Sequence, residues 1–428
     1  MIFILLFLIC SLLFFKYRSD ARYLLHPVII VVGVFALGVF VSALNFSSWG
    51  DISFTTLSII FTGILFFCIG HLGSKRRLVI GSLKKDNLNE IYRDIPLNKT
   101  IIIIAFMIVI TILDFNDIRN LAGENISGIM QIVISARHNL YIKNEAVSHV
   151  FLIQQGIYLC RALAYIYVYA FFYRVRIQKM RAKLLYLIPV VIYAIQALLS
   201  TGRTEFIYLF YAMLIINYLL LQGANQWKYR LDFRFSKQII VALIAFVTLF
   251  LFISNARNSS TFNIEHTLSI YLGSSIKAFD VYISENGIWS VSTFFGEYTQ
   301  PLLYSVLRAI GSSSNTVVDV LPPIYISGHL TNIYTAFGRY IHDYGLVGVA
   351  IIMMLLGYGY SYAFNSMECN NSTGISVMIY AFLSYPLVEM AIEERFFSNL
   401  ITARTIYCLM YMIILFKWLL KPEYIKEN

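Results

Sequence analysis

Charged residues are scarce in this chain. Asp, Glu, Lys and Arg make up 13% of its 428 residues, whereas hydrophobic residues make up 59% and the mean hydropathy is +0.71. A soluble globular domain carries about 25% charged residues, because a surface in water has to be polar. The composition therefore argues against an ordinary soluble protein and predicts a chain that lies in lipid.

Patterns that bind metals or form disulfides are lacking as well. The five cysteines include no pair at metal-ligand spacing and no pair within one predicted outer loop, and the histidines show no metal spacing. No outer loop contains an Asp-x-Asp pair, which would bridge a divalent metal to a diphosphate. The sequence thus predicts no disulfide framework, no metal site and no cofactor.

Long apolar runs are abundant instead. Runs of this kind predict transmembrane helices, although several are shorter than the roughly 20 residues that span a bilayer. The fold class is therefore predicted to be all-α: a polytopic membrane helix bundle of about 11 transmembrane helices in a single integral-membrane domain, residues 1–428. The first run lacks a basic region and a cleavage site, so we expect a retained helix. The runs cover 2–15, 24–44, 52–70, 100–113, 150–172, 184–199, 206–221, 238–253, 344–364, 375–391 and 400–420.

The basic residues predict the orientation. Of the 33 lysines and arginines, 22 fall in one set of alternate loops and nine in the opposite set. Cytoplasmic loops carry the excess of positive charge, so the chain is expected to be an inner-membrane protein with an outer N-terminus and an inner C-terminus. The net charge of +10 is then a topology signal and a match to anionic lipid, and nucleic-acid binding is excluded.

Two outer segments are long. Residues 114–149 are expected to form an interfacial helix. Residues 254–343 form the one large hydrophilic region, a predicted periplasmic loop. Long loops without secondary structure of their own are uncommon unless they are functional.

The segment TGRTE, residues 201–205, joins two of the apolar runs. An arginine near membrane depth is costly and usually has an anionic partner. Arg203 is therefore either a ligand for an anion or a closing partner for Glu205 in the turn, and we favour the functional role.

A second cluster lies at the entry to the ninth predicted span. Arg339, His342 and Asp343 would share one face if this segment is helical. A guanidinium, an imidazole and a carboxylate together suit acid–base chemistry and anion binding. The alternative is an interfacial salt bridge between Arg339 and Asp343.

Further arginines lie near the same predicted side or within the spans. Arg257 and Arg395 would add to an electropositive outer cavity, whereas each by itself is a surface anchor. Arg161 and Arg404 lie inside spans and need partners, for which Glu389 and Glu393 are the candidates in a structural ion pair.

Four motifs in this order resemble the bacterial O-antigen polymerase family, also called oligosaccharide repeat-unit polymerases. They are STGRTEFIYLF (200–210), NARNSS (255–260), FGEYTQPLLY (295–304) and NIYTAFGRYIHDYGLVGVA (332–350). The resemblance covers the central and C-terminal parts of the chain, and the first 150 residues only in hydropathy. It implies a fold similar to the multi-span (GT-C-like) glycosyltransferases.

The resemblance also implies an activity. Such a glycosyltransferase moves the growing glycan from polyprenyl diphosphate to the sugar end of a new lipid-linked repeat unit, at the periplasmic face and without a metal. Arg203 and Arg257, with Arg339 and Arg395, would neutralise the diphosphate. Asp343, His342 or Glu205 would be the base, with Asp343 preferred. The expected partners are the lipid-linked substrates, the bilayer and a chain-length regulator protein.

Three other functions compete with this one. An O-antigen ligase would share the fold and the arginines. A lipid-linked oligosaccharide flippase would have short loops on both sides, which the 90-residue outer loop disfavours. An acyltransferase would place a catalytic histidine within the membrane, and no histidine here stands out in that way.

Arg203 provides the first test. A lysine is a point charge without the planar fork that contacts a diphosphate in a paired manner. We expect Arg203→Lys to lose most polymerisation and Arg203→Ala nearly all, at unchanged protein levels, as measured from the length of the surface glycan. Normal polymerisation by Arg203→Lys would make the residue an anchor.

Overall fold

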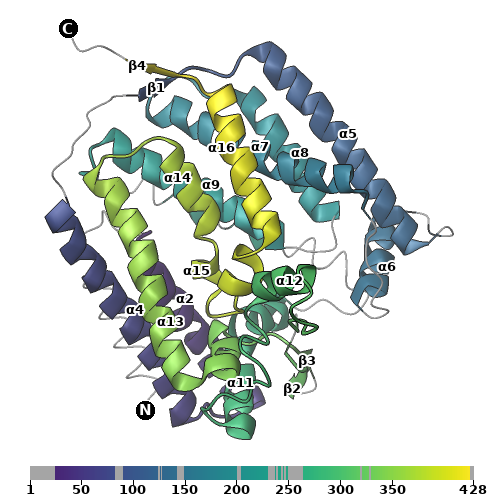
Figure 1. Ribbon diagram of the computed structural model, residues 1–428, viewed down its shortest axis with the longest axis vertical. Coiled ribbons are helices and arrows are strands. Elements are labelled where there is room, and N and C mark those ends of the chain that lie inside the picture. Colours follow the sequence, from purple (N-terminus) through teal and green to yellow (C-terminus); the bar gives the residue numbers. More distant parts are fainter. Residues whose placement is uncertain are drawn as a thin grey trace. The chain divides into compact units, whose positions relative to one another are not determined.

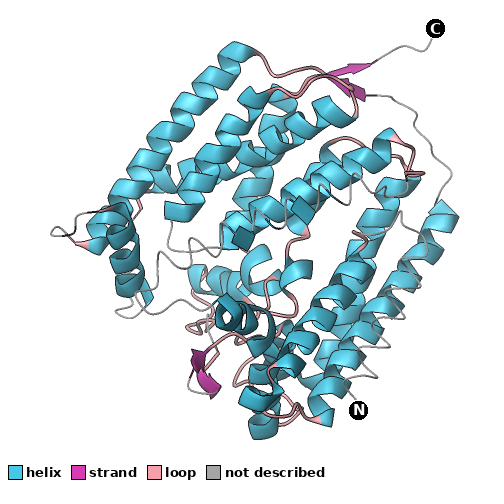
Figure 2. Ribbon diagram, turned by 180° about the vertical axis from the view of Figure 1, so that it is seen from behind, coloured by secondary structure: helices cyan, strands magenta, loops and turns pink. Residues whose placement is uncertain are grey.

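The computed structural model is built almost entirely from helices (Figure 1 and Figure 2). It describes residues 25–81, 90–123, 126, 128–141, 149–199, 204–229, 237, 240–241, 244, 247–248, 264–318, 321–326 and 329–424. These residues belong to two compact units, each assembled from segments that are far apart in the sequence. The predicted all-α membrane protein is confirmed at this level, whereas the single domain of residues 1–428 stays a prediction.

Six helices in the described part of the chain are long and apolar enough to cross a membrane. They are α2 (Pro27–Leu44), α4 (Phe54–Gly81), α5 (Leu97–Ala122), α7 (Phe151–Arg176), α9 (Thr204–Ala224) and α13 (Ala336–Cys369). Each of them overlaps one of the predicted runs. The count of eleven stays a prediction, because the first run and most of 238–253 lie outside the described residues.

Three further runs form shorter or interrupted helices. The run at 184–199 gives η2 (Leu184–Tyr186) and α8 (Leu187–Leu199), and the last run gives α16 (Ala403–Leu419). The run at 375–391 gives α14 (Ile375–Leu383) and α15 (Pro386–Glu389), where the proline cannot donate the backbone hydrogen bond of a continuous helix.

The unit that holds the candidate site combines residues 1–85, 263–370 and 383–405. Besides the helices α2, α4 and α13, this unit contains α3 (Phe46–Trp49), α11 (Ile264–Asn286), α12 (Pro301–Ala309), α15 and the five-residue π-helix η3 (Phe396–Leu400). A short antiparallel hairpin is formed by β2 (Ile324–Ile326) and β3 (His329–Thr331). The predicted large loop thus contains secondary structure of its own.

The other unit combines residues 86–262, 371–382 and 406–428. It contains α5, α7, α8, α9 and α14, with α6 (Ile129–Tyr141) packed on the end of α5 through Ile132 and Ala136. A helix is therefore present within 114–149, its interfacial position stays a prediction, and α5 extends beyond the predicted run. Strands β1 (Glu90–Tyr92) and β4 (Pro422–Tyr424) pair in antiparallel fashion.

Helices α4 and α13 pack very closely, and Figure 1 shows them side by side. A Cβ on Gly70 would come within 2.0 Å of the Met354 carbonyl oxygen, and one on Gly357 within 2.1 Å of the Phe67 carbonyl oxygen. Gly63 lies against Phe337 and Ser74 against Asn365, so the two helices run parallel. Small residues allow such an approach between membrane helices, where van der Waals packing drives association.

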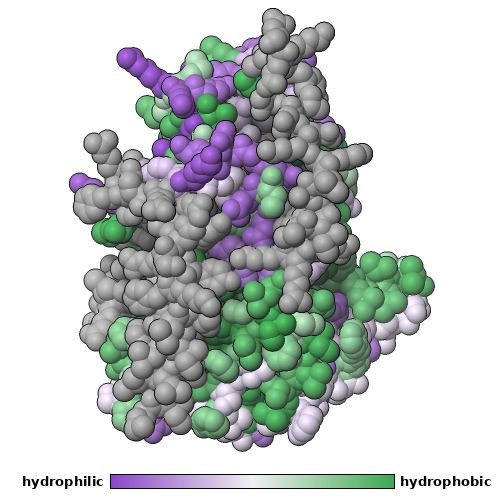
Figure 3. All heavy atoms as spheres, turned by 90° about the vertical axis from the view of Figure 1, so that its left-hand side faces the viewer, coloured by the Kyte–Doolittle hydropathy of each residue, from purple (hydrophilic) through white to green (hydrophobic). Residues whose placement is uncertain are grey.

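The outward sides of these helices are apolar. Leu65 and Leu72 of α4 and Val347 and Leu355 of α13 are exposed, as expected for side chains that contact lipid tails. Figure 3 shows the face at the left of Figure 1, where hydrophobic side chains form a broad area over the lower part.

The contact between α4 and α13 provides a test. Gly357→Ala would place a methyl group against backbone, and overpacking of this kind costs about 1–3 kcal/mol or more. We expect a lower thermal midpoint of the detergent-purified protein. Gly359→Ala is the matched control, because no atom lies within 4 Å of its Cβ position. Equal midpoints for the two variants would contradict the close packing.

Candidate functional site

A kink in α13 creates the framework of the candidate site. Gly345 interrupts the helix with φ 67° and ψ −170°, a backbone conformation that disfavours every residue with a side chain. A Cβ here would also lie 3.1 Å from the Ser290 amide nitrogen. The kink separates the first turns of α13, which carry Arg339, His342 and Asp343, from the long apolar part of the helix.

The kink frees backbone carbonyls that a continuous helix would use. The His342 carbonyl accepts hydrogen bonds from the amides of Val291 and Ser292 at 3.1 and 3.2 Å, and the Ser290 hydroxyl donates to the carbonyls of His342 and Asp343. The Leu346 amide in turn donates to the Ile288 carbonyl at 3.0 Å. The segment after α11 is thereby tied to the kink, and these buried carbonyls are satisfied.

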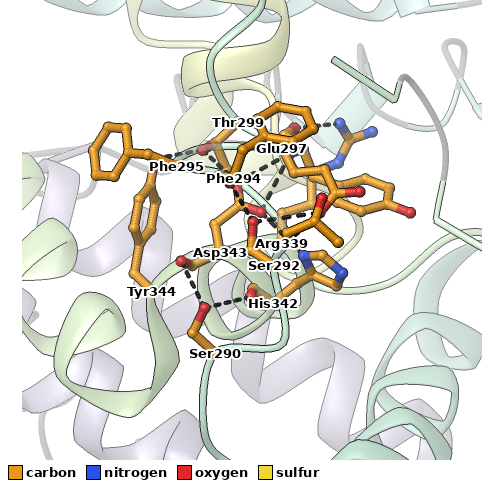
Figure 4. A network of polar contacts seen from close by, with 12 residues as sticks. Ser290, Ser292, Phe294, Phe295, Glu297, Thr299, Arg339, His342, Asp343 and Tyr344 are labelled. Atoms are coloured by element: carbon orange, nitrogen blue, oxygen red, sulfur yellow. Dashed lines mark hydrogen bonds and ion pairs between the residues drawn. The ribbon is translucent and has the colours of Figure 1, made fainter. Parts of the chain in front are cut away.

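The Asp343 side chain is fully buried and joins a second segment to the same turn. Its two oxygens accept from the Tyr298 amide at 3.2 and 3.1 Å, and Oδ2 also accepts from the Thr299 hydroxyl at 2.6 Å. The Thr299 oxygen lies 2.6 Å from the Tyr344 hydroxyl, which must be the donor because Thr299 already donates to Asp343. The motif FGEYTQ is therefore held against the motif RYIHDYG (Figure 4).

His342 lies beside this carboxylate and is less buried. Its Nδ1 is 3.1 Å from Asp343 Oδ1, and its side chain is 12% exposed against 0% for Asp343. Since the ionised carboxylate can only accept, Nδ1 carries the proton in this contact. Among the described residues, Nε2 of His342 has no hydrogen-bond partner.

Two tyrosine rings contact the imidazole. The centroid of the Tyr298 ring lies 4.4 Å from that of the imidazole in an edge-to-face arrangement, and the centroid of the Tyr282 ring lies 6.5 Å from it. Burial raises the pKa of Tyr298, and the Glu297 and Asp343 carboxylates raise it further. Burial likewise raises the pKa of Tyr282. Both phenols are therefore neutral at ordinary pH, and neither competes with the imidazole as a base.

Arg339 is buried and reaches in two directions. One nitrogen, Nη1, donates to the Tyr298 carbonyl at 2.9 Å, so Arg339 and Asp343 hold the backbone of one residue from both sides. The other, Nη2, lies 3.1 Å from Glu393 Oε1.

The ion pairs continue from Glu393 to Arg395. Glu393 Oε2 is 2.6 Å from Arg395 Nη2, and Arg395 Nε is 3.1 Å from Glu389 Oε2. The result is a chain of alternating charges, Arg339–Glu393–Arg395–Glu389. Of its two arginines, Arg395 is the more accessible, with 25% of its side chain exposed against 4%.

Glu394 fixes the backbone next to this chain. Its carboxylate accepts from the amides of Phe397 and Ser398 at 2.7 and 2.9 Å, at the start of η3, and from the Tyr340 hydroxyl at 3.3 Å. It is fully buried. A carboxylate at a helix N-terminus satisfies amides that have no partner within the helix.

Glu205 lies in the other unit, in the first turn of α9. Its Oε2 is 3.2 Å from Arg161 Nη2 and accepts from the Tyr193 hydroxyl at 3.0 Å. The partner of Arg161 was predicted to be Glu389 or Glu393, and this prediction was wrong. Arg161, on α7, is 2% exposed, and its partner Glu205 lies in the first turn of α9.

The predicted site residues therefore have different outcomes. Arg339, His342 and Asp343 share the first turns of α13, and Arg395 joins Arg339 through Glu393. Arg203 and Arg257 lie outside the described residues. Within the described part of the chain, no three His, Cys, Asp or Glu residues form a group that could hold a metal ion.

Three residues that shape the site did not stand out in these roles in the sequence: Thr299, Glu393 as a bridge, and Gly345 as a kink. Thr299 belongs to the motif FGEYTQ, so its neighbourhood was recognised without its role. A glycine directly after Asp343 and Tyr344 was a usable signal for a break in the helix.

Comparisons with known proteins give one relevant similarity. Over 132 residues the chain is 30% identical to the O-antigen polymerase of Shigella dysenteriae, which corresponds to 30% of this chain and 31% of that protein. The matched region thus spans about a third of the relative's length. No family model matches the chain, and no solved structure matches it.

Thr299 provides a test of this network. Thr299→Val keeps the shape but removes the donor to Asp343, and a buried acceptor that loses its partner costs about 1–3 kcal/mol. We expect a lower thermal midpoint and faster proteolysis within 290–300. Thr299→Ser retains the hydroxyl and is the control. Equal stability of both variants would show that the hydroxyl contributes little.

Proposed function

We propose that this protein is a membrane glycosyltransferase of the O-antigen polymerase type, which extends lipid-linked oligosaccharide repeat units. Three observations support the proposal: the apolar helices, the similarity to the Shigella dysenteriae polymerase, and the order of the motifs. The observation that carries it is the imidazole of His342, which contacts the buried carboxylate of Asp343 in the same turns of α13 as Arg339.

His342 is the base in this proposal, rather than Asp343. Both Asp343 oxygens already accept hydrogen bonds from Tyr298, Thr299 or His342, and the side chain is inaccessible. A carboxylate in this position orients the imidazole, fixes its tautomer and stabilises its charged form after proton transfer. Nε2 can then take the proton of a sugar hydroxyl. Glu205 becomes an anchor for Arg161.

The transfer step needs no further group. The hydroxyl oxygen of the acceptor sugar forms a bond to the anomeric carbon of the glycan that is linked to polyprenyl diphosphate. The bond from that carbon to the diphosphate oxygen breaks, and its electron pair leaves with the diphosphate. The hydroxyl proton moves to His342. Arginines that donate to the diphosphate stabilise the charge that develops on it.

Of the two arginines in the ion-pair chain, Arg395 is the more exposed and is proposed to meet such a substrate. Arg339 positions Tyr298 and supports Arg395 through Glu393. Arg203 and Arg257 remain proposed ligands of the diphosphate. The reaction is proposed to take place without a metal, at the periplasmic face of the inner membrane, with a chain-length regulator as a partner.

A strain that lacks the gene distinguishes a polymerase from its competitors. We expect loss of the ladder of surface-glycan lengths, with single repeat units still attached to the lipid core, and restoration by the wild-type gene. Loss of all repeat units would indicate a ligase or a flippase and would contradict the proposal.

His342 gives the sharper test. Removal of a general base typically costs 10²- to 10⁴-fold in rate, so His342→Ala should lose at least about 100-fold in turnover with little change in substrate binding. Asp343→Asn should impair turnover too, because it no longer fixes the tautomer. Added imidazole should partly restore His342→Ala. Full activity of His342→Ala in the protein purified with lipid-linked substrate would eliminate it as the base.

A further inference from the structure

The ion-pair chain contains a carboxylate that bridges two arginines. Glu393 gives one oxygen to Arg339 at 3.1 Å and the other to Arg395 at 2.6 Å. The two arginines come from segments more than 50 residues apart in sequence, the start of α13 and the turn before η3. Two guanidinium groups that each bind one oxygen of a shared anion are also the arrangement by which proteins hold a phosphate group.

The charges of the chain cancel. Two arginines face two glutamates, Glu389 and Glu393, so the cluster has no net positive charge to offer an incoming anion. A diphosphate that approaches the two arginines also meets the Glu393 carboxylate between them, and like charges repel each other. Strong binding therefore requires that Glu393 move away.

Glu393 is free to do so without loss of the surrounding fold. The backbone on one side of it is held by the Ala336 amide, which donates to the Met390 carbonyl at 2.9 Å, and by the Ser275 hydroxyl, which donates to the Ala391 carbonyl. On the other side Glu394 caps η3. The Glu393 side chain is 19% exposed, so water is available to its carboxylate once the bridge opens.

We infer that the Glu393 carboxylate occupies the site between Arg339 and Arg395 that the substrate's diphosphate would bind. The diphosphate must displace this carboxylate in order to bind. This inference rests on the proposed function and adds to it a competition at the same arginines. The competition favours release: when transfer is complete, the carboxylate returns to the arginines and expels the polyprenyl diphosphate. Without Glu393 the arginines would retain the product.

The binding of inorganic pyrophosphate to the purified full-length protein tests the inference. Glu393→Gln removes the competing charge, and we expect the dissociation constant to fall by about tenfold or more at fixed ionic strength. Glu393→Asp keeps the charge but shortens its reach, so it should bind with intermediate affinity. Arg395→Ala in the Glu393→Gln background should abolish the gain.

Glu285→Gln is the matched control. It makes the same change in net charge on an exposed residue of α11, in the same unit, and should leave the dissociation constant unchanged. An equal gain in Glu285→Gln and Glu393→Gln would reduce the effect to net charge and overturn the inference. Unchanged or weaker binding by both Glu393 variants would also overturn it, because the carboxylate would then organise the arginines rather than block them.

The surface-glycan ladder separates this inference from the proposed function. Tighter pyrophosphate binding in Glu393→Gln, together with an unaltered ladder in the deletion strain, would keep the displaceable carboxylate but reject the polymerase. A deletion strain with single repeat units and a Glu393→Gln protein that binds pyrophosphate as the wild type does would keep the polymerase and reject the role of Glu393.

Discussion

The buried carboxylate of Asp343 is the interaction on which the candidate site depends. It receives the amide of Tyr298, the hydroxyl of Thr299 and the imidazole of His342, so a segment from the large loop and the catalytic candidate meet on one side chain. An ionised group without partners in such a place would cost several kcal/mol. With its partners it fixes one arrangement, because any shift of the loop would leave a buried charge unsatisfied.

The sequence predicts those parts of the structure that depend on local composition. Long apolar runs form helices because a backbone in lipid has to satisfy its own hydrogen bonds, and six of the runs in the described residues give helices long enough to cross a membrane. The common face of Arg339 and Asp343 also follows from helical spacing. The end of α5 was harder to predict, because the helix continues past its apolar run through Asp114 and Asp117 to Ala122.

Contacts between distant segments could not be predicted in this way. Nothing local indicates that the backbone of Tyr298 lies between Arg339 and Asp343, or that Arg161 pairs with Glu205 rather than with Glu389 or Glu393. An arginine within a span requires an anionic partner, but charge alone does not select one carboxylate from several. The choice between Asp343 and His342 as the base, which stays a proposal, also depends on packing: composition gives the chemistry of both side chains, whereas only packing decides which of them is accessible.

The interleaving of the two units in the sequence has a consequence for how the protein is made. One unit ends with residues 383–405 and the other with residues 406–428, and strand β4 pairs with β1 across more than 300 residues. A ribosome that has delivered the first 370 residues to the membrane has therefore completed neither unit. The early helices have to wait in the bilayer, held by contacts such as the glycine-lined pairing of α4 with α13, until the last helices insert beside them. Quality control in the cell would thus act on the chain as a whole, and a frameshift near the 3′ end of the gene would leave both units incomplete.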